Sequence, residues 1–235
     1  MENSITKYAH KLIDQGLVDP PGPLMGGLDA DLVWNRSDAL QPLLEKVVAG
    51  LDVAAILFAR PAEPYRSLID HLVARMPAGS RALCPQDSEN RTFLHELPVV
   101  YDLSATNLVR VLKQRKCAII PGQGIISYGT VSPEQAYIVF SSVCFSLFVK
   151  AFVDFFDDLR AGHRDAVLSE LVMQGKTFYQ ACLDHAASHP DLKKGPFDNE
   201  KEAILAISEV GHLTVAKNMV DSFFGNVSYL SLIHI

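Results

Sequence analysis

Two apolar, β-branched runs interrupted by a glycine turn constrain this chain more than any other stretch. Residues 118–120 (Ala-Ile-Ile) and 125–128 (Ile-Ile-Ser-Tyr) are bounded by proline and glycine, which predicts two short strands joined at Gly122-Gln123-Gly124. Residues 132–135, Ser-Pro-Glu-Gln, then form an S-x-x-Q capping box with proline at the first helical position. We therefore expect a strand, a tight turn, a second strand and a helix start.

The chain before this stretch predicts a sheet covered by helices. Residues 52–59 form a nearly continuous apolar run, so both faces of that strand should be covered. The residues from Pro20 to Gly27 are rich in proline and glycine and predict a connecting loop without a function. Short apolar runs predict two further strands, at Arg81–Cys84 and Pro98–Leu103. Ser37 and Ser104 are the predicted N-caps of the second and fourth helices. Amphipathic spacing predicts helices at Ser4–Gln15, Ser37–Gly50, Ala62–Met76, Ala105–Arg115, Pro133–Arg160 and His163–Ala187.

The composition indicates a folded protein that does not bind nucleic acid. Apolar residues make up 49% of the 235 residues and charged residues 20%, so the chain can bury a sizeable core. The net charge of −6, without a basic cluster interleaved with aromatics, gives no electrostatic footprint for nucleic acid. The basic residues at the end of the helix at 105–115 are interpreted as a solvated helix end. Four cysteines stand far apart, which is typical of reduced, mostly buried thiols: Cys84, Cys117, Cys144 and Cys182.

No stretch indicates secretion or a membrane anchor, so we expect a cytoplasmic protein. Residues 1–12 are mixed in charge and lack an apolar signal core. The longest uncharged apolar run, Ala136–Val149, has 14 residues, short of the roughly 20 needed to span a bilayer. The helix at 133–160 is nevertheless apolar almost all round until Asp154. Its second face should meet either a second subunit or the helix at 163–187.

The order of these elements resembles the C-terminal half of a class II aldolase/adducin domain. That half has an apolar strand, a G-x-G turn, a second strand, a glycine and a capped helix beginning E-x-A. Residues 118–136 of this chain show the same order. A second match is Phe58-Ala59-Arg60-Pro61, where the family carries His-Ala-His-Pro at a strand end. The two motifs lie 65 residues apart (58 to 123), which fits the family's arrangement. The resemblance covers residues 1 to about 160 and implies an α/β fold of three layers, α/β/α, in which helices flank a central sheet.

The resemblance also implies that the family's metal site has been lost here. In class II aldolases three histidines hold a divalent metal, usually zinc, that polarises a carbonyl. The matching positions are Phe58, Arg60 and Gln123. A phenyl ring cannot ligate, a guanidinium repels a cation, and an amide oxygen is a weak ligand. We therefore expect relic metal-site positions with no catalytic residue, no metal and no other cofactor in this part of the chain.

The composition changes towards the C-terminus. After His189-Pro190 the chain becomes charged and loses its apolar periodicity, which is typical of a linker. An amphipathic helix at Ala203–Phe224 follows, and the last six residues are similar to the in-frame translation of a transposon sequencing adapter, so we expect the natural protein to continue past Tyr229. The expected parts are an aldolase/adducin-like domain at 1–162, a helix and linker at 163–198, the truncated start of a second aldolase-like domain at 199–229, and a sequencing artefact at 230–235.

A short segment after the last helix resembles an anion-binding segment of the family. Gly225, Asn226 and Ser228 form a G-N-x-S pattern, which in the family lines the pocket for the substrate phosphate or carboxylate. Glycine permits close backbone approach, and amide and hydroxyl groups can donate to an anion. The structural alternative is a helix-ending glycine followed by a polar turn.

Two functions of different classes remain open. In the first, residues 1–162 are a non-catalytic structural or interaction domain, a pseudoenzyme whose partners are a sister aldolase-like domain and copies of itself. Aldehyde-lyase chemistry and its zinc or other divalent metal would then belong to the second copy. In the second, the domain is a small-molecule binder or lyase in which Arg60 replaces the metal and holds a carboxylate or phosphate. Both predict that Arg60 and Gln123 converge, and that a buried Arg60 has an acceptor.

Overall fold

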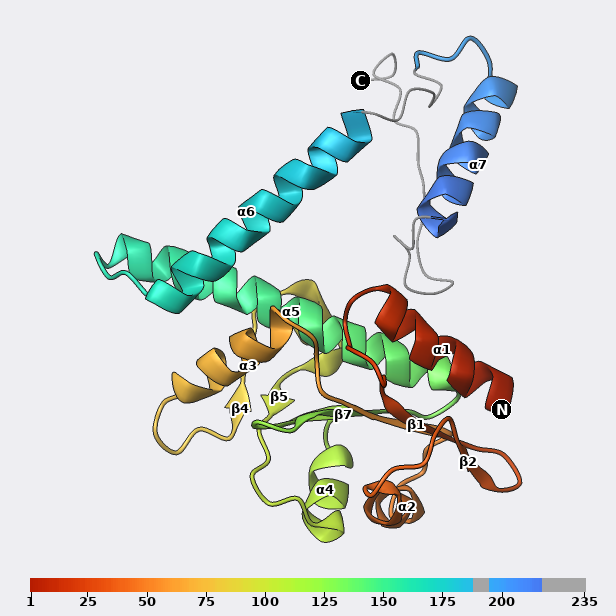
Figure 1. The fold of residues 1–235 in the computed structure, drawn as a ribbon, viewed down its shortest axis with the longest axis vertical. Coiled ribbons are helices and arrows are strands. Elements are labelled where there is room, and N and C mark those ends of the chain that lie inside the picture. Colours follow the sequence, from red (N-terminus) through yellow and green to blue (C-terminus); the bar gives the residue numbers. More distant parts are fainter. Residues whose placement is uncertain (188–194, 217–235) are drawn as a thin grey trace. The chain divides into compact units, whose positions relative to one another are not determined.

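The chain is described by a computed structural model that covers residues 1–187 and 195–216. It divides into two compact units, Met1–Val172 and Met173–Ile235 (Figure 1). The first unit contains every strand that the structure describes and the helices that cover these strands. Helix α6 (Ala166–Ala187) begins in the first unit, and α7 (Glu200–Ala216) lies in the second. The boundaries expected from the sequence at 162 and 198 stay predictions.

A five-stranded antiparallel sheet forms the centre of the first unit. Its strand order is β2-β1-β3-β7-β6, so the middle strand β3 pairs with β1 on one side and β7 on the other. The two strands predicted around the Gly-Gln-Gly turn are confirmed as the hairpin β6–β7. The strands are β1 (Leu24–Leu28), β2 (Leu32–Trp34), β3 (Ala55–Ala59), β6 (Cys117–Ile120) and β7 (Gly124–Gly129), and β4 (Ala82–Leu83) and β5 (Leu97–Pro98) form a separate pair.

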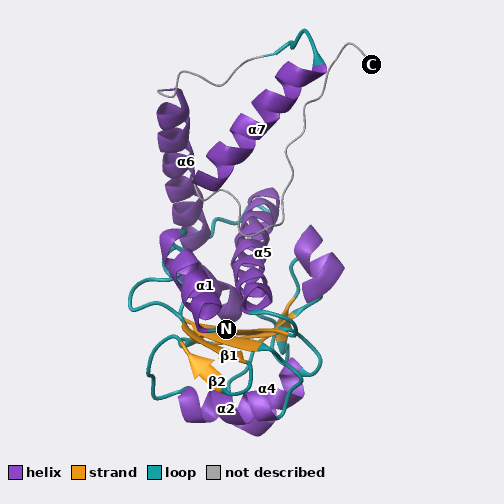
Figure 2. Ribbon diagram, turned by 90° about the vertical axis from the view of Figure 1, so that its right-hand side faces the viewer, coloured by secondary structure: helices purple, strands orange, loops and turns teal. Residues whose placement is uncertain are grey.

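Helices cover both faces of the sheet. Figure 2 shows α1 and α5 on one side of the sheet and α2 and α4 on the other. Helix α3 packs against α5 and therefore belongs to the first side. This arrangement confirms the predicted α/β class with three layers. The helices of the first unit are α1 (Glu2–Asp14), α2 (Gln41–Ala49), α3 (Tyr65–Ala74), α4 (Ala105–Leu112) and α5 (Pro133–Arg160).

The middle strand divides the core into two clusters. Side chains alternate across a strand, so Leu57 and its neighbours at 55 and 59 join the cluster under α1, α3 and α5. Ile56 and Phe58 join the cluster under α2 and α4. The apolar run at 52–59 is therefore covered on both faces, as predicted, although the regular strand begins only at Ala55.

Helix α5 is the main helix of the larger cluster. Its length and composition would allow it to cross a membrane, and 61% of its most apolar window is buried inside this structure. It lies along β7 and contacts α1 and α3. Leu168 and Leu171, from the first turns of α6, join the same core. The apolar character of α5 is thus explained largely by its position in the core.

The predicted loop at 20–27 is wrong, because its second half is β1 at the inside of the sheet. The glycines that suggested a loop allow close packing on this strand. A Cβ on Gly26 would lie 2.7 Å from the Trp34 ring, and one on Gly27 would lie 2.9 Å from Ile5 of α1. Glycine is required here by neighbours that are distant in sequence, which local propensity does not reveal.

The predicted start of the second helix is also wrong. Helix α2 begins at Gln41 with Leu40 as N-cap, not at Ser37. The Asp38 carboxylate accepts a hydrogen bond from the Leu40 backbone N–H (2.9 Å) and pairs with Arg36 (2.7 Å). This local turn holds residues 37–40 outside the helix, because an Asp side chain competes with helical hydrogen bonding.

Smaller differences concern caps and strand lengths. Ser132 is the N-cap of α5, but its side chain makes no capping bond, and Gln135 instead accepts from the Val131 backbone N–H (3.0 Å). Ser104 caps α4 as predicted by accepting from the Asn107 N–H, although α4 ends at Leu112. The strand expected at 98–103 ends at Pro98 and continues only as a bridge from Val99 to Ile119.

Ion pairs fix the end of α3 against the end of α5. Arg75 makes two hydrogen bonds to Asp158 (2.8 and 3.0 Å) and one to Asp165 (3.1 Å), and His71 Nε2 lies 2.9 Å from Asp165. The hydrogen bonds from Arg75 hold the pKa of Asp158 below its ordinary value. The cluster ties together helices that are about 80 residues apart and thereby positions α3 at the edge of the sheet.

In the second unit, the described part consists of the end of α6, residues 195–199 and α7. Asn199 caps α7 by accepting from the Glu202 backbone N–H (3.0 Å), so the helix begins three residues before the predicted Ala203. Its predicted continuation to Phe224, residues 191–194 of the predicted linker and residues 225–235 lie outside the described residues.

Candidate functional site

The pairing of β3 with β7 brings the two family-like motifs together. Ala59 is opposite Ile125 in the antiparallel register, so the next residue, Arg60, comes opposite Gly124. Adjacent strands are about 5 Å apart. Arg60 and Gln123 accordingly line one small hollow, whose other side is formed by Arg66, Ile69 and Asp70 near or on α3. The predicted convergence of Arg60 and Gln123 is therefore a feature of this structure.

Glycine at 124 is required by the close approach of the two strand ends. Gly124 has φ +153°, and a Cβ there would collide with the Ala59 carbonyl oxygen and lie 3.1 Å from the Arg60 nitrogen. Gly122 has φ +70° but open space around it, so its role is limited to the turn conformation. The Gln123 N–H donates to the Ile120 carbonyl (3.0 Å) and closes this turn.

Phe58 is part of the hydrophobic core. Its side chain is half-buried in the cluster of α2 and α4, and its position in the strand is opposite Leu24 of β1 and Ile126 of β7. The ring fills space between the sheet and its helices. The position that matches a metal-binding histidine in the family thus contributes packing here.

Arg60 differs from the expectation of a buried, paired guanidinium. It is exposed, and no hydrogen bond or ion pair joins it to a residue that the structure describes. The expectation is wrong because β3 ends at Ala59, which places the next side chain at the open edge of the sheet. Its neighbour Arg66 is paired instead, with Asp19 (2.9 Å), Glu63 (3.9 Å) and the Pro61 carbonyl (3.2 Å).

The donor set at this edge does not fit a divalent metal. Two cationic side chains, Arg60 and Arg66, accompany one carboxylate, Asp70, and one amide, Gln123. Divalent metals prefer several neutral imidazoles or anionic oxygens, which are lacking among these residues. Among the residues whose side chains the structure describes, no group of three or more His, Cys, Asp or Glu could hold a metal ion.

The hollow itself is small. Its volume is about 10 Å³, which is room for about one water molecule. A carboxylate or phosphate held by Arg60 would therefore lie on the open surface of the sheet edge. The other predicted anion-binding residues, Gly225, Asn226 and Ser228, lie outside the described residues.

Other candidate groups near the turn have structural roles. Ser127 is fully buried and its hydroxyl donates to the Ala136 carbonyl (2.8 Å), which ties β7 to α5. Burial raises the pKa of the Cys117 thiol to about 12, so this cysteine is unreactive, and Cys144 is buried as well. Cys84 is exposed while Cys117 and Cys144 are buried, which agrees with the expectation of mostly buried thiols, and the Cys182 side chain lies outside the described residues.

The contribution of α3 to this edge was missed by sequence reasoning. Arg66, Ile69 and Asp70 line the hollow from the helix that follows the Arg-Pro motif. Their spacing of three and four residues is a helical signal for one common face. That signal indicates a shared face but not which strand end the face would meet.

The fold of this chain is similar to that of solved class II aldolases. L-fuculose-1-phosphate aldolase from Thermus thermophilus aligns with a TM-score of 0.54 at 14% identity, covering 66% of this chain and 95% of the aldolase. Another L-fuculose 1-phosphate aldolase aligns with a TM-score of 0.52 at 14% identity, covering 66% of this chain and 86% of that aldolase. YgbL from Klebsiella pneumoniae aligns with a TM-score of 0.51 at 12% identity, covering 63% of this chain and 86% of YgbL. No protein-family model and no curated protein matches the sequence.

The protein therefore has the class II aldolase fold. The resemblance noted at the two sequence motifs is confirmed at the level of the fold. Identities of 12–14% carry no information on substrate or reaction.

Replacing the two turn glycines separately tests the close approach of the strand ends. Gly124→Ala should lower the free energy of unfolding by about 3 kcal/mol, because the added Cβ collides with the Ala59 carbonyl and the backbone conformation is strained. Gly122→Ala should cost only about 1 kcal/mol, because its positive φ is the single penalty. Urea unfolding followed by circular dichroism measures both. Equal losses for the two variants would show that β3 and β7 do not meet as described.

Proposed function

We propose that the first unit is a metal-free, non-catalytic domain of class II aldolase fold that serves in structure or interaction. Any aldehyde-lyase chemistry, with zinc or another divalent metal, would reside in a second aldolase-like copy beginning at 199–229. Its partners would be that sister domain and a further copy of this chain, and its location the cytoplasm. The proposal rests on two observations. The solved aldolases share this fold, and the residues at one edge of the sheet have a chemistry that does not suit a metal.

The observation that carries the proposal is the nature of the three side chains at the converging strand ends. Phe58 packs in the core, Arg60 brings a permanent positive charge, and Gln123 offers a weak amide oxygen. A change of pH does not turn these three side chains into metal ligands, because the guanidinium stays charged and neither of the other two groups titrates. The geometry of the fold is retained while the donors that a metal requires are replaced.

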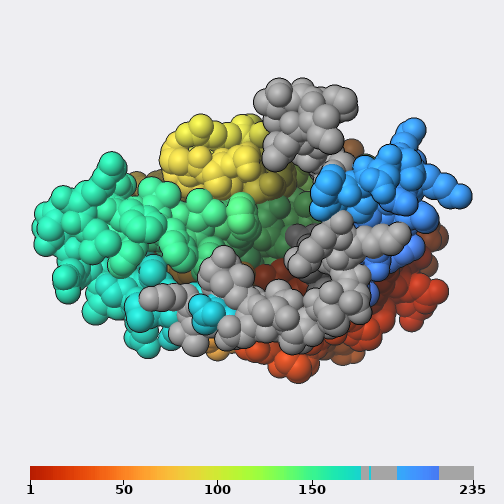
Figure 3. Space-filling model, turned by 90° about the horizontal axis from the view of Figure 1, so that it is seen from above, coloured from red at the N-terminus to blue at the C-terminus, as the bar shows by residue number. Residues whose placement is uncertain are grey.

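A role in association is supported by helix α5. Phe145 and Phe156 are 51% and 55% exposed, and Val153 and Leu159 are 43% exposed. Seen from above, the green surface of α5 lies between red α1 and the yellow residues that follow α3 (Figure 3). Large apolar side chains at the surface of a helix that otherwise packs in the core favour contact with another protein surface. A second copy of the chain is the occupant that we propose.

The second candidate function is an anion site at Arg60. It is favoured by one observation, the exposed guanidinium without a partner in the described part of the chain. A free arginine can bind carboxylate or phosphate through two hydrogen bonds. The adjoining hollow of about 10 Å³ encloses no ligand of substrate size, so the structural role is supported better.

The zinc content of the purified chain tests the first proposal. After dialysis against metal-free buffer, the wild-type chain should contain no stoichiometric zinc, because the three relic positions provide no suitable donor set. Elemental analysis by mass spectrometry gives the zinc per chain. Cys84→Ser serves as control, since the exposed thiol could collect zinc adventitiously. About one zinc per chain in both proteins would contradict a metal-free domain.

The association of the chain is tested by changing the exposed face of α5. The wild-type chain should form a dimer or larger oligomer, and Phe145→Asp with Phe156→Asp should shift it to monomer by placing charges in the apolar contact. Val131→Asp is the matched control, because Val131 is 74% exposed but lies before the helix. Light scattering after size-exclusion chromatography measures the mass. A wild-type chain that is monomeric at about 50 µM, a concentration at which even weak specific interfaces associate, would exclude self-association through α5.

A further inference from the structure

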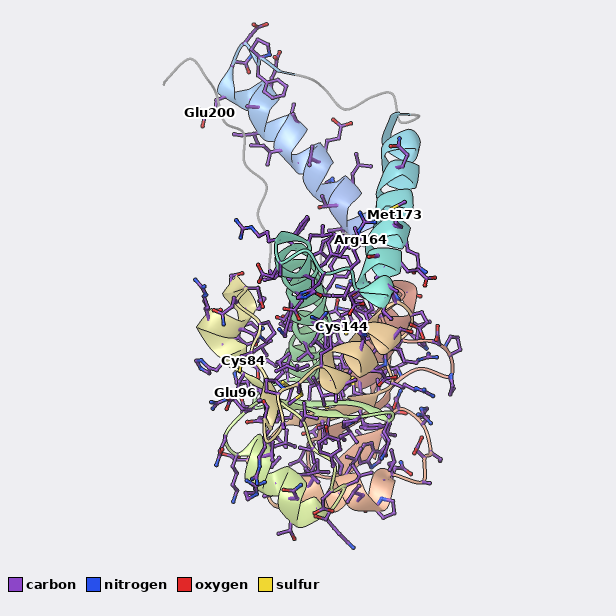
Figure 4. All side chains as sticks on the ribbon, turned by 90° about the vertical axis from the view of Figure 1, so that its left-hand side faces the viewer. Cys84, Glu96, Cys144, Arg164, Met173 and Glu200 are labelled. Carbon is purple, nitrogen blue, oxygen red and sulfur yellow. The ribbon has the colours of Figure 1, made fainter. Side chains whose placement is uncertain are left out.

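A second charged hollow of the first unit lies away from the Arg60 edge. It has a volume of about 490 Å³, within the range of sites for small molecules, and shares no residue with the hollow at Arg60. Its walls are the start of β4, the chain around β5 and the outer face of α4. Figure 4 shows two of its residues, Cys84 and Glu96, close together on one side of the unit.

The charged residues of this hollow are mostly arginines. Arg81 directly precedes β4, Arg110 and Arg115 come from the last turn of α4 and the residues after it, and Glu96 is the one carboxylate in the lining. Three guanidiniums against one carboxylate give the hollow a net charge of +2 in a chain of net charge −6. A local positive site in an acidic protein attracts anions selectively by its field.

The arginines are not neutralised by the protein. Arg115 pairs with Glu96 (2.9 Å) and donates to the Gln114 carbonyl (2.8 Å), while its buried Nε lacks a partner. Arg110 donates to the neutral side-chain amide oxygen (Oδ1) of Asn107 (2.7 Å). The Arg81 guanidinium is exposed, and no hydrogen bond or ion pair joins it to a side chain that the structure describes. Two full positive charges and one buried N–H are therefore available to a ligand.

The arrangement differs from an ordinary solvated helix end. Arg115 is only 29% exposed and is held in place by its bond to Glu96 across the hollow. Arg110 is likewise oriented by Asn107 one turn earlier on α4. Holding a guanidinium in one geometry before a ligand arrives reduces the entropy lost on binding. The hollow is consequently better prepared for an anion than a set of free surface arginines.

We propose that this hollow, named here the arginine pocket, binds the phosphate monoester of a small organic molecule. A phosphate monoester carries a charge of about −1.5 to −2 at neutral pH, which matches the two positive charges that the protein leaves unpaired. Arginine also fits phosphate geometrically, because the planar guanidinium donates two parallel hydrogen bonds. A monocarboxylate would leave one of these charges unpaired.

Tyr101 indicates the character of the organic part. Its side chain is 71% exposed at the rim of the arginine pocket, near the apolar atoms of Pro98 and Val111. An exposed aromatic ring beside a cationic site provides a surface on which a flat ring can stack. Since a phosphate group fills only part of about 490 Å³, the ligand includes an organic group that reaches Tyr101.

Binding is measured by isothermal titration calorimetry with adenosine monophosphate, ribose 5-phosphate, inorganic phosphate and adenosine. We expect saturable binding of the two monoesters, tighter for adenosine monophosphate, weaker binding of inorganic phosphate, and none of adenosine. Arg81→Gln and Arg110→Gln should each weaken monoester binding about tenfold, because each removes a charge-assisted contact. Tyr101→Ala should weaken the binding of adenosine monophosphate several-fold and leave the affinity for inorganic phosphate unchanged.

The control variant is Arg164→Gln, which removes an exposed arginine that lines neither the arginine pocket nor the hollow at Arg60. It should leave monoester affinity unchanged. An equal loss from Arg164→Gln, or unchanged affinity in both Arg81→Gln and Arg110→Gln, would overturn the arginine pocket as the site. So would the absence of binding by either monoester at millimolar concentration to a folded wild-type chain. These results do not depend on zinc content, so the pocket and the metal-free domain can fail separately.

Discussion

The antiparallel pairing of β3 with β7 is the interaction on which the rest of the first unit depends. It places an apolar strand at the centre of the sheet, so that Leu57 packs under α5 while Ile56 packs towards α2 and α4. The same pairing brings Arg60 opposite Gly124 and so creates the sheet edge at which both sequence motifs meet. Because side chains alternate along a strand, a shift of one residue would exchange the two cores and separate the motifs.

The fold and a metal site at this edge have different requirements, so the fold can form without the donors of a metal site. The backbone approach needs a glycine at 124 and a short turn before it, and both are present. A metal needs donor atoms, whereas the Phe58 ring has none and packs against the core cluster under α2 and α4. The arginine pocket on the far side of α4 needs neither feature. Its charges are held by Glu96 and Asn107, so binding there would not require catalysis at the relic edge.

Sequence reasoning succeeded where the determining interactions are local. The β6–β7 hairpin, the Ser104 cap and the start of α5 all follow from residues within a few positions of one another. It failed at β1, because Gly26 and Gly27 accommodate Trp34 and Ile5 rather than a turn. The convergence of Arg60 and Gln123 was accessible only through the family resemblance. The exposure of Arg60, and the presence of Arg81 and Arg110 in the lining of one hollow, depend on tertiary packing that no local pattern indicates.

The central proposal is that the first unit has the class II aldolase fold without the donors that a divalent metal requires. The most direct measurement is cobalt binding by a chain carrying Phe58→His, Arg60→His and Gln123→His, followed by visible absorption spectroscopy. Arg60→His with Gln123→His changes only exposed side chains and provides a version that preserves the core. The account predicts about one bound Co²⁺ per chain for the triple variant, weaker binding for the double variant and none for the wild type. A folded triple variant and a folded double variant that both bind no more cobalt than the wild type would contradict it.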